Sequence, residues 1–173
     1  MEQTLSGFRD WFRSNGGSLH QSIVLESDSN GIRPVVRDDA SAVEPSATLV
    51  VCPSRLMVSY VHAQYSQSLK PLIERDPSST SNQIITLRFF MIEQYLLAGK
   101  SFWWPYLQTL PQPSDKDLLN ATPRWSDEEI RWLEKTNLAQ ATRLKKATWA
   151  HEYEQALACL IQHSSGLEHK LTW

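Results

Sequence analysis

The chain has 173 residues, of which 41% are hydrophobic and 21% charged, and its net charge is −2 at pH 7. This length is enough to bury a core, and the slightly acidic balance excludes the basic surface typical of nucleic-acid-binding proteins. No apolar run approaches the roughly 18 residues of a membrane span, and the first residues lack the basic and apolar regions of a signal peptide, so we expect no nucleic-acid or membrane partner.

The first third of the chain predicts one helix and three short strands. Phe8, Trp11 and Phe12 recur at helical spacing, and Gly16 follows them as a terminator. Turn residues and β-branched runs then alternate, which favours short strands separated by turns and polar loops. The strands are expected over 23–26, 33–37 and 48–52, with a turn at 27–31 and a polar loop at 38–46.

The rest of the chain reads as helical. Ser126 and Glu129 have the spacing of a capping box, which marks a helix start. A nearly continuous apolar segment over 84–97 predicts a helix buried on most sides. Further helices are expected over 59–74, with Ser59 as its cap, and 138–162, with a linker at 76–82 and a proline-punctuated loop at 111–123.

The predicted core belongs mainly to these helices, because short connections let them bury apolar faces locally. It comprises Leu87, Phe90, Met91, Tyr95, Trp104, Tyr106, Leu107, Leu133, Leu144 and Leu157. The last helix is expected to turn inward Ala141, Leu144, Tyr153, Leu157, Leu160 and Ile161.

The residues alone assemble no catalytic set. The chain has no phosphate-binding glycine loop, no Cys-x-x-Cys and no ligand spacing among its five histidines. We therefore predict no catalytic residue and no metal site. The basic run 143–146 is read as a solvated helix face, with contact to a phosphate or an acidic partner as the alternative.

Four segments, in order, resemble a known family. Residues 101–111 match the S-x-W-x-P-Y-L-x-x-L-P segment of SET-domain protein methyltransferases related to the plant Rubisco large-subunit methyltransferase. The others are 8–16 (F-x-x-W-x-x-x-x-G), 52–60 (C-P-x-x-L-x-x-S-Y, common in fungal members) and 132–138 (W-L-x-G-T-x-L, with Lys135 for Gly).

The resemblance implies an α+β fold that is mostly helical. Residues 1–58 would form an N-terminal SET-like β segment with a leading helix, and residues 59–173 an inserted helical subdomain. The family binds S-adenosylmethionine and methylates a side chain of a protein substrate, usually lysine. We therefore expect the N-terminal portion of such an enzyme, with a protein substrate as partner once a C-terminal half completes it.

The resemblance places cofactor contacts at Asn30, Gly31 and Ile32, where the family has a Gly-x-Gly turn. Only glycine tolerates close backbone approach there. In this chain Arg33 replaces the second glycine and Pro34 follows it, so we expect weak or absent cofactor binding.

The family's Asn-His pair and late catalytic tyrosine would fall after Trp173, so we expect no catalysis by this chain alone. A truncated product, a mis-split gene and a degenerate remnant stay open. The alternative function is a non-catalytic helical protein-interaction module, and a third interpretation is an unrelated helical protein. The strand at 48–52 is expected to present an unpaired edge where the missing half would dock, which would favour self-association.

The two cysteines, Cys52 and Cys159, are too few for a disulfide framework. Such usage is typical of a reducing compartment. We therefore expect a location in the cytoplasm or nucleus.

Overall fold

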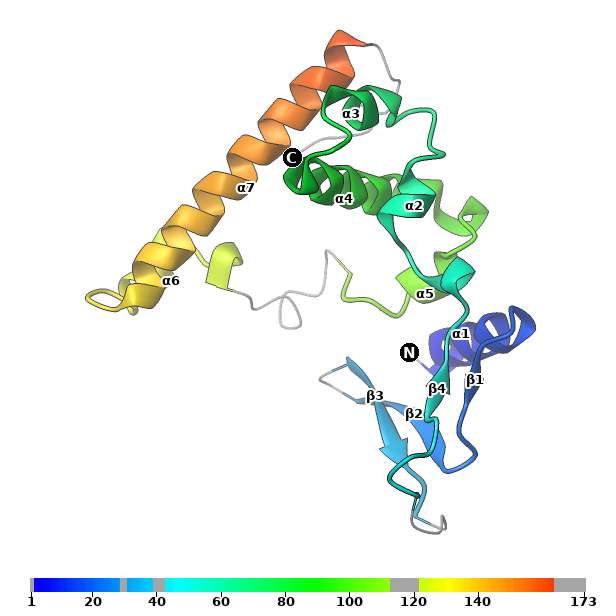
Figure 1. Cartoon of the computed structure of the whole chain (residues 1–173). Helices are drawn as coiled ribbons and strands as arrows, with labels where there is room; N and C mark the ends of the chain where they lie inside the picture. The colour runs from blue at the N-terminus through cyan, green and yellow to red at the C-terminus, as the bar shows by residue number, and fades with distance from the viewer. Residues whose placement is uncertain (1, 29–30, 39–42, 113–121, 164–173) are drawn as a thin grey trace. The chain divides into compact units, whose positions relative to one another are not determined.

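The computed structural model describes residues 2–28, 31–38, 43–112 and 122–163. Within them the chain forms two compact units (Figure 1). We call them the strand unit, from the described parts of Met1–Val58 and Ala98–Leu118, and the helical unit, from those of Ser59–Leu97 and Leu119–Trp173. The division predicted at residues 1–58 and 59–173 concerns folding domains and stays a prediction.

The strand unit combines two helices with two small antiparallel sheets. Its elements are α1 (Glu2–Ser14), β1 (Ser18–Leu19), β2 (Ile23–Asp28), β3 (Gly31–Val36), β4 (Val50–Val51), the 3₁₀ turns η1 (Ser54–Leu56) and η2 (Ala98–Lys100), and α5 (Trp104–Leu107).

The helical unit is built around two long helices. Its elements are α2 (Tyr60–Ala63), α3 (Lys70–Arg75), α4 (Thr80–Leu97), the 3₁₀ turn η3 (Thr122–Arg124), α6 (Asp127–Arg131) and α7 (Asn137–Gln162). The α+β class expected from the sequence is confirmed. No helix among the described residues has the length and apolarity to cross a bilayer.

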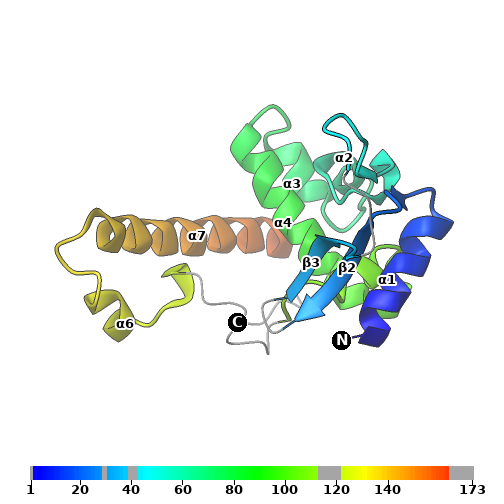
Figure 2. The same ribbon diagram turned by 90° about the horizontal axis from the view of Figure 1, so that it is seen from below.

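In the strand unit, α1 carries an aromatic face. The ring of Phe8 lies 5.8 Å from that of Phe12 and 6.4 Å from that of Tyr106 on α5, while Trp11 meets Phe102 edge-on at 5.5 Å. Aromatic pairs at such distances add to the free energy gained by burying their surface. The helix predicted at the start of the chain is therefore confirmed. It also packs against β2, a strand of the β2–β3 sheet (Figure 2).

Close packing at the end of α1 depends on Gly17. A Cβ added there would lie 2.5 Å from the buried ring of Phe12. We expect Gly17→Ala to lower the free energy of unfolding by about 1–3 kcal/mol, because the backbone or the ring must shift. Gly7→Ala is the matched control, since a Cβ at Gly7 meets nothing within 4 Å and alanine favours the helix by about 0.5–1 kcal/mol. Chemical denaturation measures both; equal changes would show that Phe12 is not held against this backbone.

The predicted strand at 48–52 is shorter than expected. It is β4, which pairs with β1, a two-residue strand that the sequence pattern did not reveal. The pairing holds Ser18 opposite Val51 and Leu19 opposite Val50, and Pro53 ends the run because it has no N–H to donate. One edge of this strand is therefore paired with β1, and among the described residues no strand pairs with its other edge.

The predicted helix over 59–74 is two helices, α2 and α3. Pro71 lies in the first turn of α3, where its missing N–H costs nothing, but inside a continuous helix it would break the ladder. Ser59 is at the predicted N-cap position, and its carbonyl accepts from the N–H groups of His62 and Ala63 at 3.1 Å. Its side chain makes no cap bond; the Oγ lies 3.0 Å from His62 Nδ1.

The segment predicted as a linker over 76–82 contains the start of α4. Asn82 is buried, and its Nδ2 donates to the carbonyl oxygens of Leu72 at 2.8 Å and Asp76 at 3.1 Å. Ser79 Oγ accepts from the N–H of Asn82 at 3.3 Å, as an N-cap does. The serine-rich composition therefore reflects helix capping rather than a linker.

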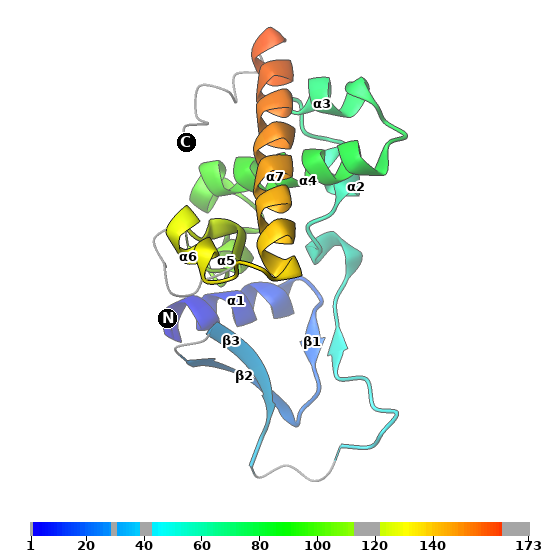
Figure 3. The ribbon, with the colours of Figure 1, turned by 90° about the vertical axis from the view of Figure 1, so that its left-hand side faces the viewer.

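The long helices bury narrower faces than predicted. In α4, Ile84, Leu96 and Leu97 are exposed, because only one face of the helix packs on α2, α3 and α7 (Figure 3). The bounds of α7 are close to those predicted, but its face was predicted only in part: Leu160 is buried as expected, and Tyr153 and Leu157 are half-buried. Its buried residues are Ala139, Thr142, Ala156 and Leu160, whereas Ala141, Leu144 and Ile161 are exposed.

Two residues of the predicted core, Phe90 and Leu107, are fully buried. The prediction that Leu144 belongs to the core is wrong, because 67% of its surface is exposed. The other predicted residues are half-buried: Leu87, Met91, Tyr95, Trp104, Tyr106, Leu133 and Leu157.

The predicted capping box at the start of α6 is confirmed. Ser126 Oγ accepts from the N–H of Glu129 at 3.2 Å, and Glu129 Oε2 accepts from the N–H of Ser126 at 2.7 Å. These bonds to the backbone and hydroxyl of Ser126 lower the pKa of Glu129 below its ordinary value. The carboxylate therefore favours the folded state when ionised, and this contribution is lost as the pH falls through its lowered pKa.

Candidate cofactor site

The candidate site is built on the hairpin of β2 and β3. Asp28 lies opposite Gly31, and Ser27 lies opposite Ile32. The N–H of Arg37 donates to the carbonyl of Ser22 at 2.9 Å, which fixes the phase of the ladder. Pairs that include even-numbered residues of β2 therefore exchange hydrogen bonds, and those that include odd-numbered residues do not.

This phase explains why Pro34 is tolerated in a strand. Pro34 lies opposite Leu25 in a pair that exchanges no hydrogen bonds. Its missing N–H therefore faces away from β2 and costs no ladder bond, as is usual for proline in edge strands. The carbonyl of Leu25 likewise faces away from β3, where the guanidinium of Arg9 on α1 donates to it.

Gly31 begins β3 in a conformation that favours glycine. Its φ is +116°, and a Cβ added there would meet no atom within 4 Å. The side chain of Arg33 points back across the hairpin, where its Nε lies 3.5 Å from Asp28 Oδ2 and its Nη2 3.9 Å from Glu26 Oε2. Both pairs are substantially exposed, so they orient the arginine more than they stabilise the fold.

A hollow of about 570 Å³ lies between the hairpin and α1. Its lining residues are Glu2, Leu5, Arg9, Leu25, Glu26, Ser27 and Asp28. Three of them carry carboxylates and one a guanidinium, and two of the carboxylates, on Glu26 and Asp28, also pair with Arg33. The Oγ of Ser27 is buried and has no hydrogen-bond partner among the described residues, which is uncommon for a buried hydroxyl.

The structure brings together only part of the predicted set. Gly31 and Ile32 lie next to each other at the start of β3, whereas Asn30 lies outside the described residues. Sequence reasoning missed Arg9 and Ser27. Arg9 reaches the hairpin from α1, and no local pattern signals such a contact. No three His, Cys, Asp or Glu side chains in the described part of the chain are placed to hold a metal ion.

Comparison with solved structures settles the fold. The chain aligns with a structure of Rubisco LSMT bound to sinefungin and monomethyllysine, with a TM-score of 0.74 and 19% identity over 98% of this chain. It also aligns with the SET domain of LSMT bound to lysine and AdoHcy, with a TM-score of 0.75 and 18% identity over the whole chain. This is part of a SET-domain fold. The aligned regions are 37% and 36% of those two chains.

The resemblance stated from the sequence motifs is therefore confirmed for the SET fold. A curated relative, the ribosomal lysine N-methyltransferase set10 of Schizosaccharomyces pombe, is 27% identical over 148 residues, which are 83% of this chain. The chain spans about a quarter of that relative's length, since the match covers 25% of it. No family model matches the chain.

Proposed function

We propose that this chain forms part of an S-adenosylmethionine-dependent protein lysine methyltransferase of the SET type, in its fungal form. Its contribution is the hairpin turn at 30–32, which approaches the cofactor through its backbone. The observation that carries this role is Gly31, because its φ of +116° and the open space around it occur at the position that the family motif assigns to the cofactor.

The residues of the hairpin fit this cofactor. S-adenosylmethionine carries a sulfonium, an ammonium and a carboxylate, so its overall charge is positive at neutral pH. Of the three carboxylates around the hollow, Glu26 and Asp28 pair with Arg33, and that of Glu2 favours a cation. Bound S-adenosylmethionine would supply an electrophilic methyl group. The chain's own part is to present the backbone of Gly31, beside which a Cβ would meet no atom within 4 Å.

We infer that the chain does not transfer a methyl group by itself. Transfer needs an acceptor amine and a donor held in a fixed geometry. The sequence contains no Asn-His dipeptide, and none of its five tyrosines lines the hollow beside the hairpin. The family's Asn-His pair and its late catalytic tyrosine therefore have no counterpart in these residues.

A labelling experiment tests this proposal. The purified chain is incubated with tritiated S-adenosylmethionine and ribosomes, and equilibrium dialysis measures cofactor binding in parallel. We expect no label on protein above the blank, and a dissociation constant weaker than micromolar. Label in a ribosomal protein, or micromolar binding, would contradict the inference that the chain is incomplete as an enzyme.

We also propose that the chain self-associates through β4. Leu49, Val50 and Val51 are consecutive, and each is about half exposed. Exposed apolar strand residues favour pairing with another chain. Sedimentation velocity should show oligomers that Val50→Lys shifts toward monomer. Val61→Lys, at an exposed valine of the helical unit, is the control and should leave the distribution unchanged; a wild-type chain that sediments as a monomer at all concentrations would refute this idea.

The free thiols agree with a location in the cytoplasm or nucleus, which we propose for the protein. Cys52 is exposed, Cys159 is half-buried, and neither forms a disulfide in the described residues. An exposed thiol persists most readily in a reducing compartment.

A further inference from the structure

A small apolar hollow lies between α4 and α7 in the helical unit, and the function proposed above does not use it. Its volume is about 270 Å³, close to the lower limit for ligand pockets. Phe89 is buried in it and stacks on Tyr153, with ring centroids 5.6 Å apart and planes 20° apart. Ile85 and Ile92 of α4 and Trp149 of α7 complete its apolar lining. The hollow is large enough for one big side chain.

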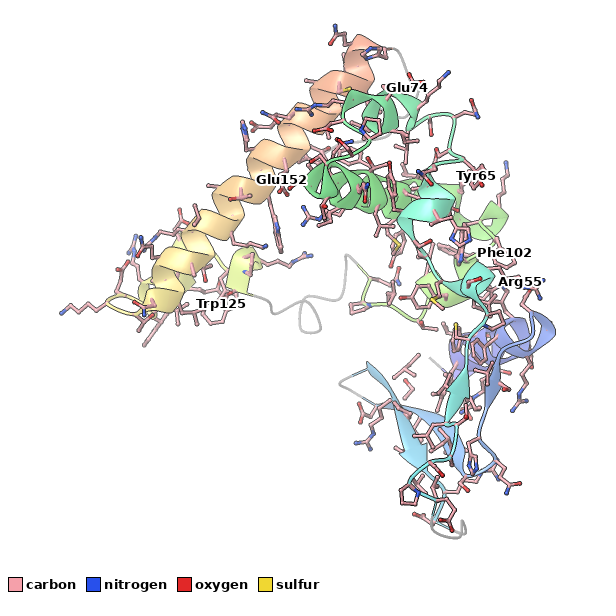
Figure 4. The ribbon with its side chains drawn as sticks, in the orientation of Figure 1. Arg55, Tyr65, Glu74, Phe102, Trp125 and Glu152 are labelled. Atoms are coloured by element: carbon pink, nitrogen blue, oxygen red, sulfur yellow. The ribbon has the colours of Figure 1, made fainter. Side chains whose placement is uncertain are left out.

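Positive charge surrounds Trp149 at the rim of this hollow. The guanidinium of Arg88 lies 5.9 Å from the indole centroid, and Lys145 Nζ lies 5.4 Å from it. Arg88 also pairs with Glu152, which projects from α7 (Figure 4). Among the described residues no carboxylate lies within 4 Å of Lys145. Two cations and one carboxylate therefore lie around Trp149; Arg88 and Glu152 line the hollow, and Lys145 lies beside the indole.

The combination of shape and charge indicates the kind of ligand. Trp149 is 40% exposed although it lines an apolar hollow, and exposed apolar surface next to charge is typical of protein-binding sites. An apolar side chain would remove the indole and the isoleucines from water. A carboxylate beside it would neutralise Lys145 in the same step.

We propose that this hollow docks an acidic segment of a partner protein. The segment inserts one large apolar side chain between α4 and α7 and places a carboxylate against Lys145, with Arg88 as a second contact. Opposite charges at such a rim raise the association rate and select the partner, while the buried side chain supplies most of the affinity. This surface does not depend on the cofactor hairpin, since it lies wholly within the helical unit.

Fluorescence polarisation of a labelled peptide tests the proposal. The probe is fluorescein-Glu-Glu-Leu-Phe-Glu-Glu-amide, and its matched control has lysine in place of each glutamate. We expect saturable binding of the acidic peptide by the full chain, at least tenfold weaker binding of the basic one, and a loss of affinity as salt rises. Lys145→Glu should weaken binding at least tenfold. Lys135→Glu, the same charge change at an exposed site outside the hollow, should leave it within twofold.

A second variant tests the hollow itself. Trp149→Ala removes its wall and should abolish saturable binding, with thermal unfolding measured to confirm that the variant is folded. The proposal is overturned if the wild-type chain does not bind the acidic peptide, if the basic peptide binds equally well, or if the two lysine variants behave alike. It is also overturned if the chain binds no peptide but forms dimers that Trp149→Ala dissociates, because the occupant would then be a second copy.

Discussion

Phe89→Ala should lower the free energy of unfolding of the helical unit by about 3–5 kcal/mol, the usual cost of removing a large buried ring. Phe89 is only 3% exposed and stacks on Tyr153, so it joins the two long helices. Alanine would leave a cavity between them, because α4 and α7 meet over a short stretch and have few other contacts to close it. Total stabilities of about 5–15 kcal/mol make such a loss large. Denaturant unfolding followed by circular dichroism measures it.

Trp132→Ala is the control for this prediction. Trp132 is a larger aromatic residue of the same unit, but it is 87% exposed, and surface substitutions usually change stability by no more than about 0.5 kcal/mol. Equal losses from the two variants would mean that the helical core has been placed incorrectly.

Gly31→Val should have the largest effect on cofactor binding. The measurement uses a hybrid protein in which this chain replaces the matching region of the S. pombe relative, because the chain alone is expected to bind weakly. A branched side chain at a φ of +116° is strained, and its methyl groups would occupy the space that the cofactor approaches. We expect the dissociation constant for S-adenosylmethionine to rise at least tenfold, as measured by calorimetry.

Gly16→Val separates strain from contact. Gly16 also lies in the strand unit with a positive φ, +82°, and is not part of the hairpin. Both variants place a branched residue at a positive φ, but only Gly31→Val should weaken cofactor binding. If both weaken it equally, the effect comes from folding and Gly31 has no special role.

Local signals predicted much of the fold. The aromatic spacing that predicted α1, and the capping box at Ser126, act over one or two turns and need no tertiary context. The predictions that failed concern elements that are fixed by contacts between distant segments of the chain. Two-residue β1 has no pattern of its own and exists because β4 pairs with it. The start of α4 depends on Asn82, whose amide bonds to two carbonyls earlier in the chain.

The inward face of α7 was predicted only in part, because hydrophobicity was taken as the guide. The predicted Leu160 is buried, but the other buried residues are the small Ala139, Thr142 and Ala156, and the large Leu144 is left in solvent. A helical pattern of apolar residues does not tell which of them are buried within this chain and which stay exposed on its surface.

The candidate site was only partly predictable. The resemblance placed the turn at Gly31, and the structure gives that residue the unusual backbone that such a turn needs. The orientation of Arg33 could not be foreseen, because it depends on a strand register that brings Asp28 and Glu26 within reach. The contact of Arg9 with Leu25 likewise depends on the packing of α1 against β2.

Methyl transfer by the hybrid protein tests the central claim most directly. The hybrid and the intact S. pombe relative are incubated under the same conditions with tritiated S-adenosylmethionine and ribosomes from a strain that lacks set10. If this chain forms part of a lysine methyltransferase, the hybrid should label lysine in ribosomal protein, and Gly31→Val should abolish the label. A hybrid that unfolds cooperatively, yet neither binds S-adenosylmethionine nor transfers label while the intact relative does both, would contradict the account.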